Sequence, residues 1–279
     1  MEQARLKKDY KPYICMSLFL LAFAITYAVN LILPAEKTIL LPFDNSINAR
    51  AWTWLEILIS AVAAFYIFKT RKFTPLDLVV GVILGVIVKY AGWYGYTSGI
   101  ATVICYYSGC QIFRKYKQQD KYFNMGVKKI LKSLLLGSAL AIPFAIVNSW
   151  GSLSTLNYST ADFGFTRILR SAAGALPPGI SEEVIFHFFL LAFATEVFGG
   201  SIPKKRATLF LVYFMCVVPH VLVHLPSYFT QSPVSALISA VWLSLLFGTP
   251  MVWLIRNKNL QTSMAFHWFI DFLRLVVEV

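Results

Sequence analysis

Seven ionisable side chains stand inside apolar stretches near the C-terminal end of the chain, and as a group they have the functional groups needed for chemistry on water. They are Glu182, Glu183, His187, His220, His224, His267 and Asp271. A charge at the centre of a bilayer costs about 2.5–3.5 kcal/mol on insertion scales, so an ionisable group in an apolar helix is a candidate for function. Carboxylates beside imidazoles can activate water as general acids and bases, bind a metal or relay protons.

The first motif, with two glutamates and a histidine, follows a Pro-Pro-Gly sequence at 177–179. Prolines kink or end a helix and free backbone groups, which predicts room for water at this point. Glu183 and His187 are four residues apart on one helix face, so we expect them to pair. Glu182 points about 100° away in a helix of 3.6 residues per turn and is predicted to face a cavity. Alternatively, both glutamates belong only to a satisfied polar cluster between helices.

The second and third motifs each place two polar side chains one helical turn apart. A single buried histidine is usually a hydrogen-bonded core residue, but His220 and His224 share one face of an otherwise apolar helix, which favours a functional site. His267 and Asp271 have the same spacing, and an aspartate beside a histidine can set its tautomer and orientation. Because the rest of the chain has little such polarity, the three motifs together predict one shared site.

The composition is that of a chain whose solvent is lipid. Of 279 residues, 58% are hydrophobic and 14% are charged, and the mean hydropathy is +0.65. Soluble domains average about 45–50% apolar and about 25% charged residues. The net charge of +12 comes from cations clustered between apolar runs. These features predict an all-α, polytopic transmembrane helical bundle with the lipid bilayer as its partner, and they exclude a nucleic-acid-binding protein.

Apolar runs of about 20 residues are long enough to cross the ~30 Å hydrocarbon layer, and they predict eight or nine spans. The run near the N-terminus is longer than the ~7–15-residue apolar core of a signal peptide and is therefore expected to remain as a transmembrane helix. The runs at 76–94 and 99–113 form two spans, one long helix or a re-entrant segment. The predicted spans are 12–33, 51–68, 76–94, 99–113, 131–150, 167–198, 207–225, 233–255 and 260–277.

The placement of cations predicts the orientation of these spans. Cytoplasmic loops carry an excess of Lys and Arg, and 19 of the 25 cations fall in five clusters: Arg5 to Lys11, Lys69 to Lys72, Arg114 to Lys132, Lys204 to Arg206, and Arg256 with Lys258. All five lie on one side if 76–113 crosses the membrane and returns. We therefore expect an integral plasma-membrane protein with a cytoplasmic N-terminus and with loops 34–50, 151–165 and 226–232 on the outer side.

The remaining motifs have structural explanations. The absence of a CxxC spacing predicts buried free thiols, with no disulfide or cysteine zinc site, at Cys15, Cys105, Cys110 and Cys216. Gly81 and Gly85 are spaced for close helix packing, and Lys89 is expected to snorkel or pair locally. We find no internal repeat or linker, so residues 1–279 are interpreted as one integral membrane domain.

The three motifs resemble those of the CPBP family of intramembrane glutamic endopeptidases, which includes the CAAX prenyl endopeptidases and bacteriocin-processing and immunity proteins. The motifs are Glu-Glu-x-x-x-His, a His-Leu-Pro after an apolar helix, and His-x-x-x-Asp. The family pattern is EExxxR, FxxxH and HxxxN. The resemblance covers 165–279, which would be a CPBP-like catalytic core, and leaves 1–160 as transmembrane helices of unassigned role.

The resemblance implies that Glu182 activates water with help from a histidine of the second motif. It favours His224, which Leu-Pro follows, and leaves His220 in a supporting role. His267 and Asp271 would hold the substrate carbonyl or stabilise the oxyanion. An ionised carboxylate cannot donate a hydrogen bond, so Asp271 either stays protonated through desolvation or orients His267. The four-residue spacing favours orientation.

The expected function is therefore hydrolysis of a peptide bond in a hydrophobic or lipidated peptide, without a metal cofactor. His187 stands where the family has Arg, which weakens the clamp on Glu183. Three alternatives remain: a zinc-dependent protease using the histidines and a glutamate, a proton-coupled transporter, and a non-catalytic immunity or partner protein. The substrate and the oligomeric state are not specified by the sequence.

Overall fold

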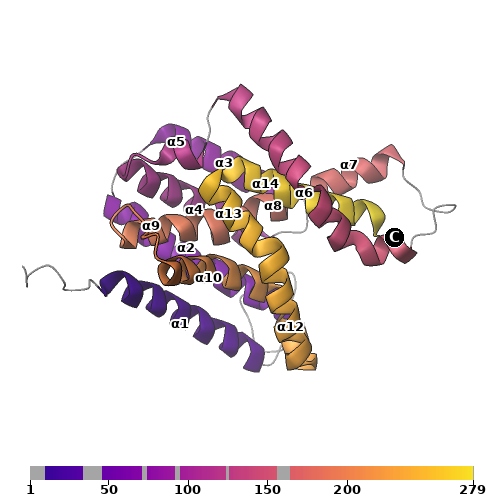
Figure 1. The fold of residues 1–279 in the computed structure, drawn as a ribbon, viewed down its shortest axis with the longest axis horizontal. Coiled ribbons are helices and arrows are strands. Elements are labelled where there is room, and N and C mark those ends of the chain that lie inside the picture. The colour runs from indigo at the N-terminus through magenta and orange to yellow at the C-terminus, as the bar shows by residue number, and fades with distance from the viewer. Residues whose placement is uncertain are drawn as a thin grey trace, which may run out of the picture.

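The computed structural model is all-helical over the residues it describes, which are 10–33, 46–70, 74–91, 95–123, 126–155 and 164–278. Most of the predicted outer loop 34–50, residues 156–163 of the next, and the cations Arg5, Lys7, Lys8, Arg71 and Lys72 lie outside this part. Figure 1 shows the helices, which are α1 (Lys11–Ile32), α2 (Ile47–Thr70), α3 (Pro75–Tyr90), α4 (Tyr96–Lys115), α5 (Gln119–Tyr122), α6 (Val127–Thr155), α7 (Phe165–Gly174), α8 (Leu176–Glu182), η3 (Glu183–Phe189), α9 (Leu190–Val197), α10 (Arg206–Val223), α11 (Pro226–Gln231), α12 (Pro233–Leu243), η4 (Ser244–Gly248), α13 (Thr249–Asn257) and α14 (Leu260–Val277).

Several of these helices are those of a membrane protein. Among the described residues, five helical segments are long and apolar enough to cross a bilayer: Lys11–Ile32, Ile47–Thr70, Val127–Trp150, Arg206–Val223 and Pro233–Asn257. Length and hydropathy therefore confirm the predicted helical membrane class, while the expected count of eight or nine spans is not confirmed. One reason is that α3 has only 16 residues, and another is that helix 176–197 carries three carboxylates.

The ambiguous region 76–113 is a pair of antiparallel helices, α3 and α4. A Cβ at Gly85 would lie 2.6 Å from the carbonyl oxygen of Gly99, and one at Gly81 would lie 3.1 Å from the ring of Tyr106. Only residues without a side chain allow two backbones to come this close. The expectation of close helix packing at Gly81 and Gly85 is confirmed, and the region consists of two helices packed against each other.

The predicted span 167–198 is wrong as a single element, because the chain breaks at Ala175 between α7 and α8. Pro177 and Pro178 follow this break, and because proline has no backbone N–H, neither can bond a carbonyl in the last turn of α7. From Leu176 the chain continues as one helix, α8–η3–α9, in which 183–189 form a π-helical stretch. π-Helical stretches are rare in proteins, and those that occur are often found at functional sites.

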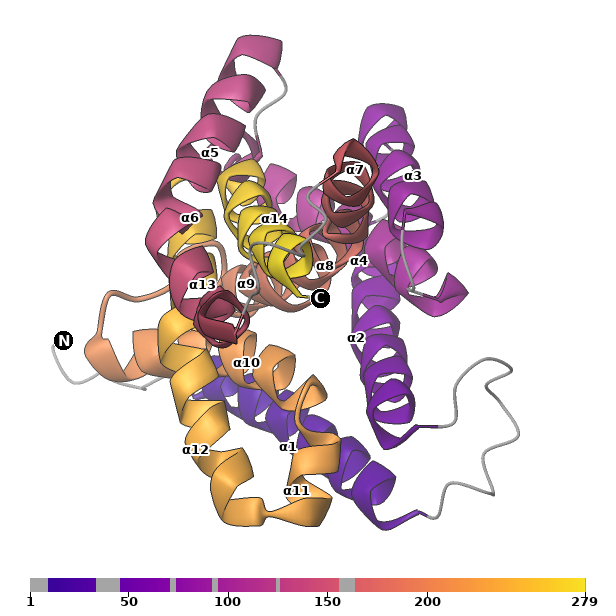
Figure 2. The ribbon, with the colours of Figure 1, turned by 90° about the vertical axis from the view of Figure 1, so that its right-hand side faces the viewer.

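Helix 176–197 forms the centre of the molecule. All seven side chains of η3 are buried, and η3 contacts α2, α4, α10, α13 and α14. Its neighbour α8 lies amid the other helices in Figures 1 and 2. The outer helices α1, α6 and α12 instead expose large apolar side chains such as Leu135 and Trp242. The exposure of so many large apolar side chains suits a surface that faces lipid.

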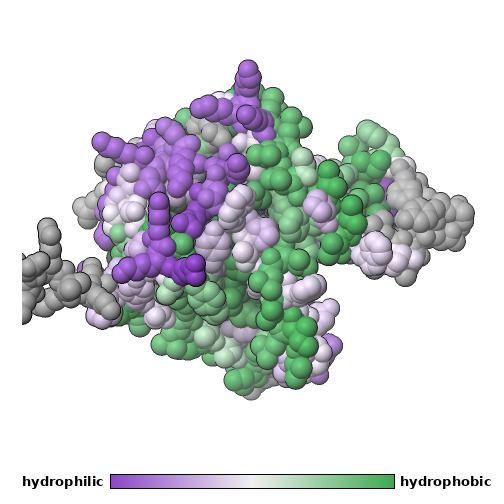
Figure 3. Space-filling view, in the orientation of Figure 1, coloured by the Kyte–Doolittle hydropathy of each residue, from purple (hydrophilic) through white to green (hydrophobic). Residues whose placement is uncertain are grey.

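The two ends of the molecule differ in charge. Lys115 Nζ lies 2.7 Å and Lys69 Nζ 3.5 Å from Glu196 Oε1, and Tyr13 bonds to Thr208 over 2.8 Å. These contacts gather the start of α1, the ends of α2, α4 and α9, and the start of α10. In Figure 3 the hydrophilic surface gathers at upper left, where Figure 1 labels α4, α5 and α9. We call this the basic end.

The opposite end, here the cation-poor end, holds the end of α1, the start of α2 and the turn between α10 and α12. Asn48 Nδ2 donates to Ser227 Oγ over 3.2 Å, and Arg50 Nη2 donates to the carbonyl of Leu33 over 3.1 Å. The cysteines are free as predicted; three are buried, and Cys15 is half-buried.

Gly137 lies where α6 packs against α14, and even a methyl group at this position should disturb the contact. A Cβ there would overlap the backbone carbonyl of Thr262 and lie 2.9 Å from the Cβ of Ala265. We expect Gly137→Ala to lower the free energy of unfolding by about 1–3 kcal/mol, which is the usual effect of overpacking. Thermal unfolding of the detergent-purified protein measures this change. A Cβ at Gly126 meets no atom within 4 Å, so Gly126→Ala is the control. Equal stability of both variants would contradict this packing.

Candidate active site

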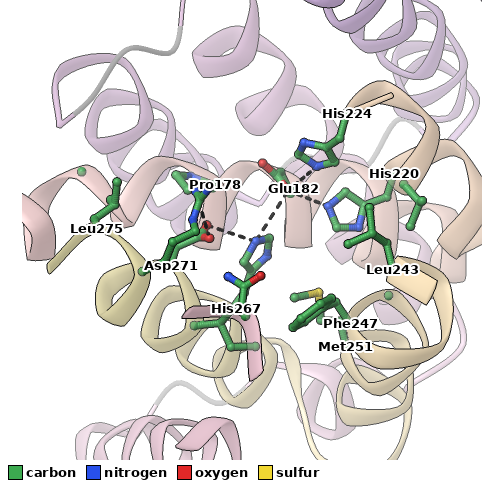
Figure 4. Close-up of a pocket in the computed structure, with 16 residues that line it drawn as sticks. Pro178, Glu182, His220, His224, Leu243, Phe247, Met251, His267, Asp271 and Leu275 are labelled. Carbon is green, nitrogen blue, oxygen red and sulfur yellow. Dashed lines mark hydrogen bonds and ion pairs between the residues drawn. The ribbon is translucent and has the colours of Figure 1, made fainter. Parts of the chain in front are cut away.

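One oxygen of Glu182 is surrounded by three imidazole nitrogens. Glu182 Oε2 lies 2.5 Å from His220 Nε2, 3.4 Å from His224 Nε2 and 3.6 Å from His267 Nε2 (Figure 4). The three motifs, which lie 38 to 85 residues apart in sequence, therefore converge on one carboxylate. The closest histidine is His220, although the sequence favoured His224 as the principal partner.

The local sequence explains how α10 presents two histidines. His220 lies in the last turn of α10, after Pro219, and His224 caps the end of that helix. The four-residue spacing places both rings on the side that meets Glu182. Their exposures differ, because 6% of the His220 side chain and 43% of the His224 side chain are accessible. His220 therefore belongs to the buried wall, and His224 to the rim.

Glu183 is enclosed by the protein. His187 Nδ1 lies 3.1 Å from its Oε2, Ser263 Oγ donates to the same oxygen over 2.5 Å, and His267 Nδ1 lies 2.9 Å from its Oε1. The predicted pairing of Glu183 with His187 is confirmed. Both residues are 0% exposed, so this pair forms the support behind the site.

His267 connects the two glutamates. Its Nδ1 contacts Glu183, while its Nε2 faces Glu182 and lies 3.4 Å from Asp271 Oδ2. Carboxylate oxygens near both ring nitrogens suit the doubly protonated imidazolium, which donates from both positions. The predicted contact between His267 and Asp271 is present. Asp271 is held in turn by Arg274, whose Nη2 lies 3.3 Å from Asp271 Oδ1.

A cavity of about 430 Å³ adjoins this cluster. Its polar wall contains Glu182, His220, His224, His267 and Asp271, as Figure 4 shows; Glu183 and His187 do not line it. The predicted difference between the two glutamates, one facing a cavity and one paired behind it, is confirmed. The remaining wall is mainly apolar, with Leu243, Phe247, Met251 and Ile270 among its members. This volume is within the usual range of ligand pockets, which is roughly 300–1,000 Å³.

Two further residues of the site were missed in the sequence. Glu56 is 0% exposed in the middle of α2, and Trp52 Nε1 donates to its Oε1 over 2.7 Å. The Trp52 ring meets His224 edge-on, with centroids 5.2 Å apart. The signal was available, because Glu56 is a carboxylate in the apolar run 51–68 and the rule applied to the C-terminal motifs covers it too.

The donor set also suits a metal ion. One ligand atom each from Glu182, His220 and His267 lie within 4.8 Å of one another, and His224 Nε2 is 3.4 Å from Glu182. Imidazole nitrogen and carboxylate oxygen bind Zn²⁺ at about 2.0–2.2 Å. Small side-chain rotations would bring these donors to one ion.

Comparison with known proteins identifies no relative. No protein-family model matches the chain, and no curated protein or solved structure matches it either. The functional interpretation therefore depends on the motifs and their geometry. That geometry combines a buried carboxylate, adjacent imidazoles and a cavity, which is a suitable arrangement for activating a water molecule.

Loss of the Glu183 carboxylate should destabilise the protein. Removing one partner of a buried ion pair leaves the other charge uncompensated and typically costs about 3–5 kcal/mol, so we expect Glu183→Leu to lower the free energy of unfolding by that order. Glu278→Leu is the control. The Glu278 side chain is 47% exposed, and its Oε1 makes only a long contact, 3.9 Å, with Arg274 Nη1. Thermal unfolding in detergent measures both. A Glu183→Leu protein as stable as the control would show that the carboxylate is not held as described.

Proposed function

We propose that this protein is an intramembrane endopeptidase of the CPBP type, in which Glu182 activates water to hydrolyse a peptide bond. The observation that carries the proposal is the convergence of three histidines on Glu182 at the wall of the cavity. A purely structural cluster would be expected to close around its carboxylates, as it does around Glu183. Glu182 instead borders a space large enough for water and a peptide segment.

In the proposed mechanism Glu182 takes a proton from water as the water oxygen bonds to the carbonyl carbon of the substrate. His220 holds the carboxylate, and His224, at the rim, shares the hydrogen bonds of the water. The oxyanion of the tetrahedral intermediate accepts a hydrogen bond from His267. The proton on Glu182 then passes to the amide nitrogen as the carbon–nitrogen bond breaks, which regenerates the carboxylate. Loss of one such oxyanion donor typically costs about 2.7–4 kcal/mol.

The supporting residues set the protonation state of His267. Glu183 accepts the hydrogen bond of His267 Nδ1, and the Asp271 carboxylate, 3.4 Å from Nε2, favours the charged ring, whose Nε2–H then donates to the oxyanion. The residues around them hold the two carboxylates in place: His187 and Ser263 for Glu183, and Arg274 for Asp271. Asp271 thus acts through His267, and no contact of Asp271 with the substrate is needed.

The substrate proposed is a hydrophobic or lipidated peptide. The wall opposite the polar cluster is formed by Leu243, Phe247 and Met251, and apolar side chains of a peptide would be stabilised there by about 25 cal/mol per Å² buried. The outer helices expose apolar side chains that suit lipid.

We also propose nine crossings in the plasma membrane, with the basic end and the N-terminus in the cytoplasm. The proposed crossings, all within the described residues, are α1, α2, α3, α4, α6, 176–197, α10, Pro233–Asn257 and α14; five of these, in α1, α2, α6, α10 and Pro233–Asn257, are long and apolar enough to span a bilayer. The lateral contacts described above support this path, and the positive-inside rule supports its orientation.

Replacing Glu182 by Gln should abolish peptide cleavage while the protein remains folded. Gln keeps the shape of the side chain but is no base, so we expect at least a 100-fold loss, consistent with the usual 10²–10⁴ contribution of a general base. The measurement is cleavage of quenched-fluorescent peptides with apolar residues around the central bond, by purified protein in liposomes.

The matched control is Glu196→Gln on the same helix. Glu196 is also a buried carboxylate, but it pairs with Lys115 at the basic end, so this variant should cleave as the parent does. Undiminished cleavage by Glu182→Gln would reject the mechanism. Two results would favour a non-catalytic protein. One is that the parent protein cleaves none of the peptides. The other is that host membrane proteins have the same terminal peptides in cells with the parent protein and in cells with Glu182→Gln.

A zinc-dependent protease is the second candidate, because ligand atoms of Glu182, His220 and His267 lie within 4.8 Å of one another. Bound zinc would supply a Lewis acid and an activated water. In that case the purified protein should contain one equivalent of zinc, lose cleavage in a chelator and regain it with added Zn²⁺. His220→Ala should lose the metal, and Glu196→Gln should keep it. Cleavage that persists in the metal-stripped protein would support the metal-free mechanism instead.

A further inference from the structure

The cavity lies in the half of the molecule that is remote from the basic end. Glu182 is the seventh residue of helix 176–197, counted from the cation-poor end, and Glu196 marks the basic end through its contact with Lys115. Fourteen residues separate the two glutamates, which is roughly 21 Å at 1.5 Å per helical residue. The site is therefore much nearer to one face of the molecule than to the other.

The mouth of the cavity is formed by the cation-poor ends of several helices. Gly174 ends α7, His224 caps α10, and Arg274 and Leu275 lie in the last turn of α14. The side chains of His224 and Arg274 are 43% and 41% accessible. These residues give the cavity a polar opening at the cation-poor end.

The path from the site to the basic end is closed by packing. Along the central helix, every residue from 184 to 194 is at most 5% exposed. This stretch includes the large side chains of Phe186, Phe188 and Phe189. Protein interiors packed at this density hold few voids larger than a water molecule. Along the central helix, this packed stretch separates Glu182 from the basic end.

The cations indicate which face is cytoplasmic. Of the cations in the described residues, fourteen lie at the basic end and five at the other; the five are Arg50, Lys89, Arg167, Arg170 and Arg274. Short loops that are rich in Lys and Arg stay on the cytoplasmic side of the membrane. Of the five exceptions, Arg50 is buried, and Arg274 is paired with Asp271.

We infer that the cavity opens to the extracytoplasmic side of the membrane, so that its substrate is a polypeptide segment already moved across the bilayer. The orientation follows from packing and charge alone, whereas the nature of the substrate rests on the proposed peptidase function. The class of reaction that must supply this substrate is translocation of a polypeptide. A lipidated C-terminus displayed on the cytoplasmic leaflet would face the closed side and would not be cleaved.

Cysteine labelling tests the orientation. In a protein with Cys15→Ser and the three buried cysteines retained, Leu275→Cys places a thiol at the mouth, and Lys128→Cys places one at the exposed start of α6 at the basic end. A membrane-impermeant maleimide is applied to intact cells and to permeabilised cells. We expect Leu275→Cys to be labelled equally in both, and Lys128→Cys only after permeabilisation.

Asn148→Cys, at a second cavity-lining position, guards against a local defect and should behave as Leu275→Cys does. Labelling of both mouth variants only after permeabilisation would overturn the inference, as would labelling of Lys128→Cys in intact cells. The result does not depend on activity, so a Glu182→Gln protein should label identically. Extracytoplasmic labelling without peptide cleavage would leave the orientation standing and reject the peptidase.

The substrate is tested with a reporter peptide of apolar sequence that is anchored by one transmembrane helix. Intact cells that produce the active protein should cleave the reporter when it is displayed outside and leave it uncut when it is displayed in the cytoplasm, and Glu182→Gln should cut neither. Cleavage of only the cytoplasmic reporter would overturn the inference while supporting the peptidase.

Discussion

Two adjacent carboxylates buried in one helix are the constraint around which the molecule is arranged. An ionised carboxylate loses several kcal/mol of solvation in an apolar interior unless hydrogen-bond donors replace the water. Glu182 and Glu183 find these donors on α10, η3 and α14, which must therefore meet helix 176–197. The central position of this helix, with η3 fully buried, satisfies its own charges. The lipid-facing helices cover the resulting bundle with apolar side chains.

Adjacency in the sequence separates the two glutamates in space. Successive residues of a helix differ by about 100° in direction, so one carboxylate turns toward α14 and His187 and the other toward the cavity. His267 bonds to Glu183 through one ring nitrogen and faces Glu182 through the other, so one imidazole contacts both the enclosed and the cavity-facing carboxylate. The proline break at Ala175 and the π-helical stretch lie on either side of Glu182. Departures from regular helix thus coincide with the place where the proposed chemistry needs space and polarity.

The asymmetry of the bundle gives this site a direction. Cations, and the contacts of Lys69 and Lys115 with Glu196, hold the helix ends together at one face, and a dense apolar core separates that face from the cavity. At the other face, His224 and Arg274 are among the residues that line the cavity. A reaction centre open to only one side can be exposed to peptides of one compartment and shielded from those of the other.

Composition and local spacing were sufficient to predict the helical membrane class, the pairing of Glu183 with His187, the contact of His267 with Asp271, and Glu182 at a cavity, because these depend on residues within one or two helical turns. They were not sufficient for the shorter contact of Glu182 with His220 than with His224, or for the link from Glu56 through Trp52 to the site. In a chain surrounded by lipid, apolar residues cover all faces of a helix, so the sequence pattern does not specify how each helix is rotated or which one it meets. Close packing at glycines and the need to satisfy buried polar groups decide those contacts, and both exist only once the helices are assembled.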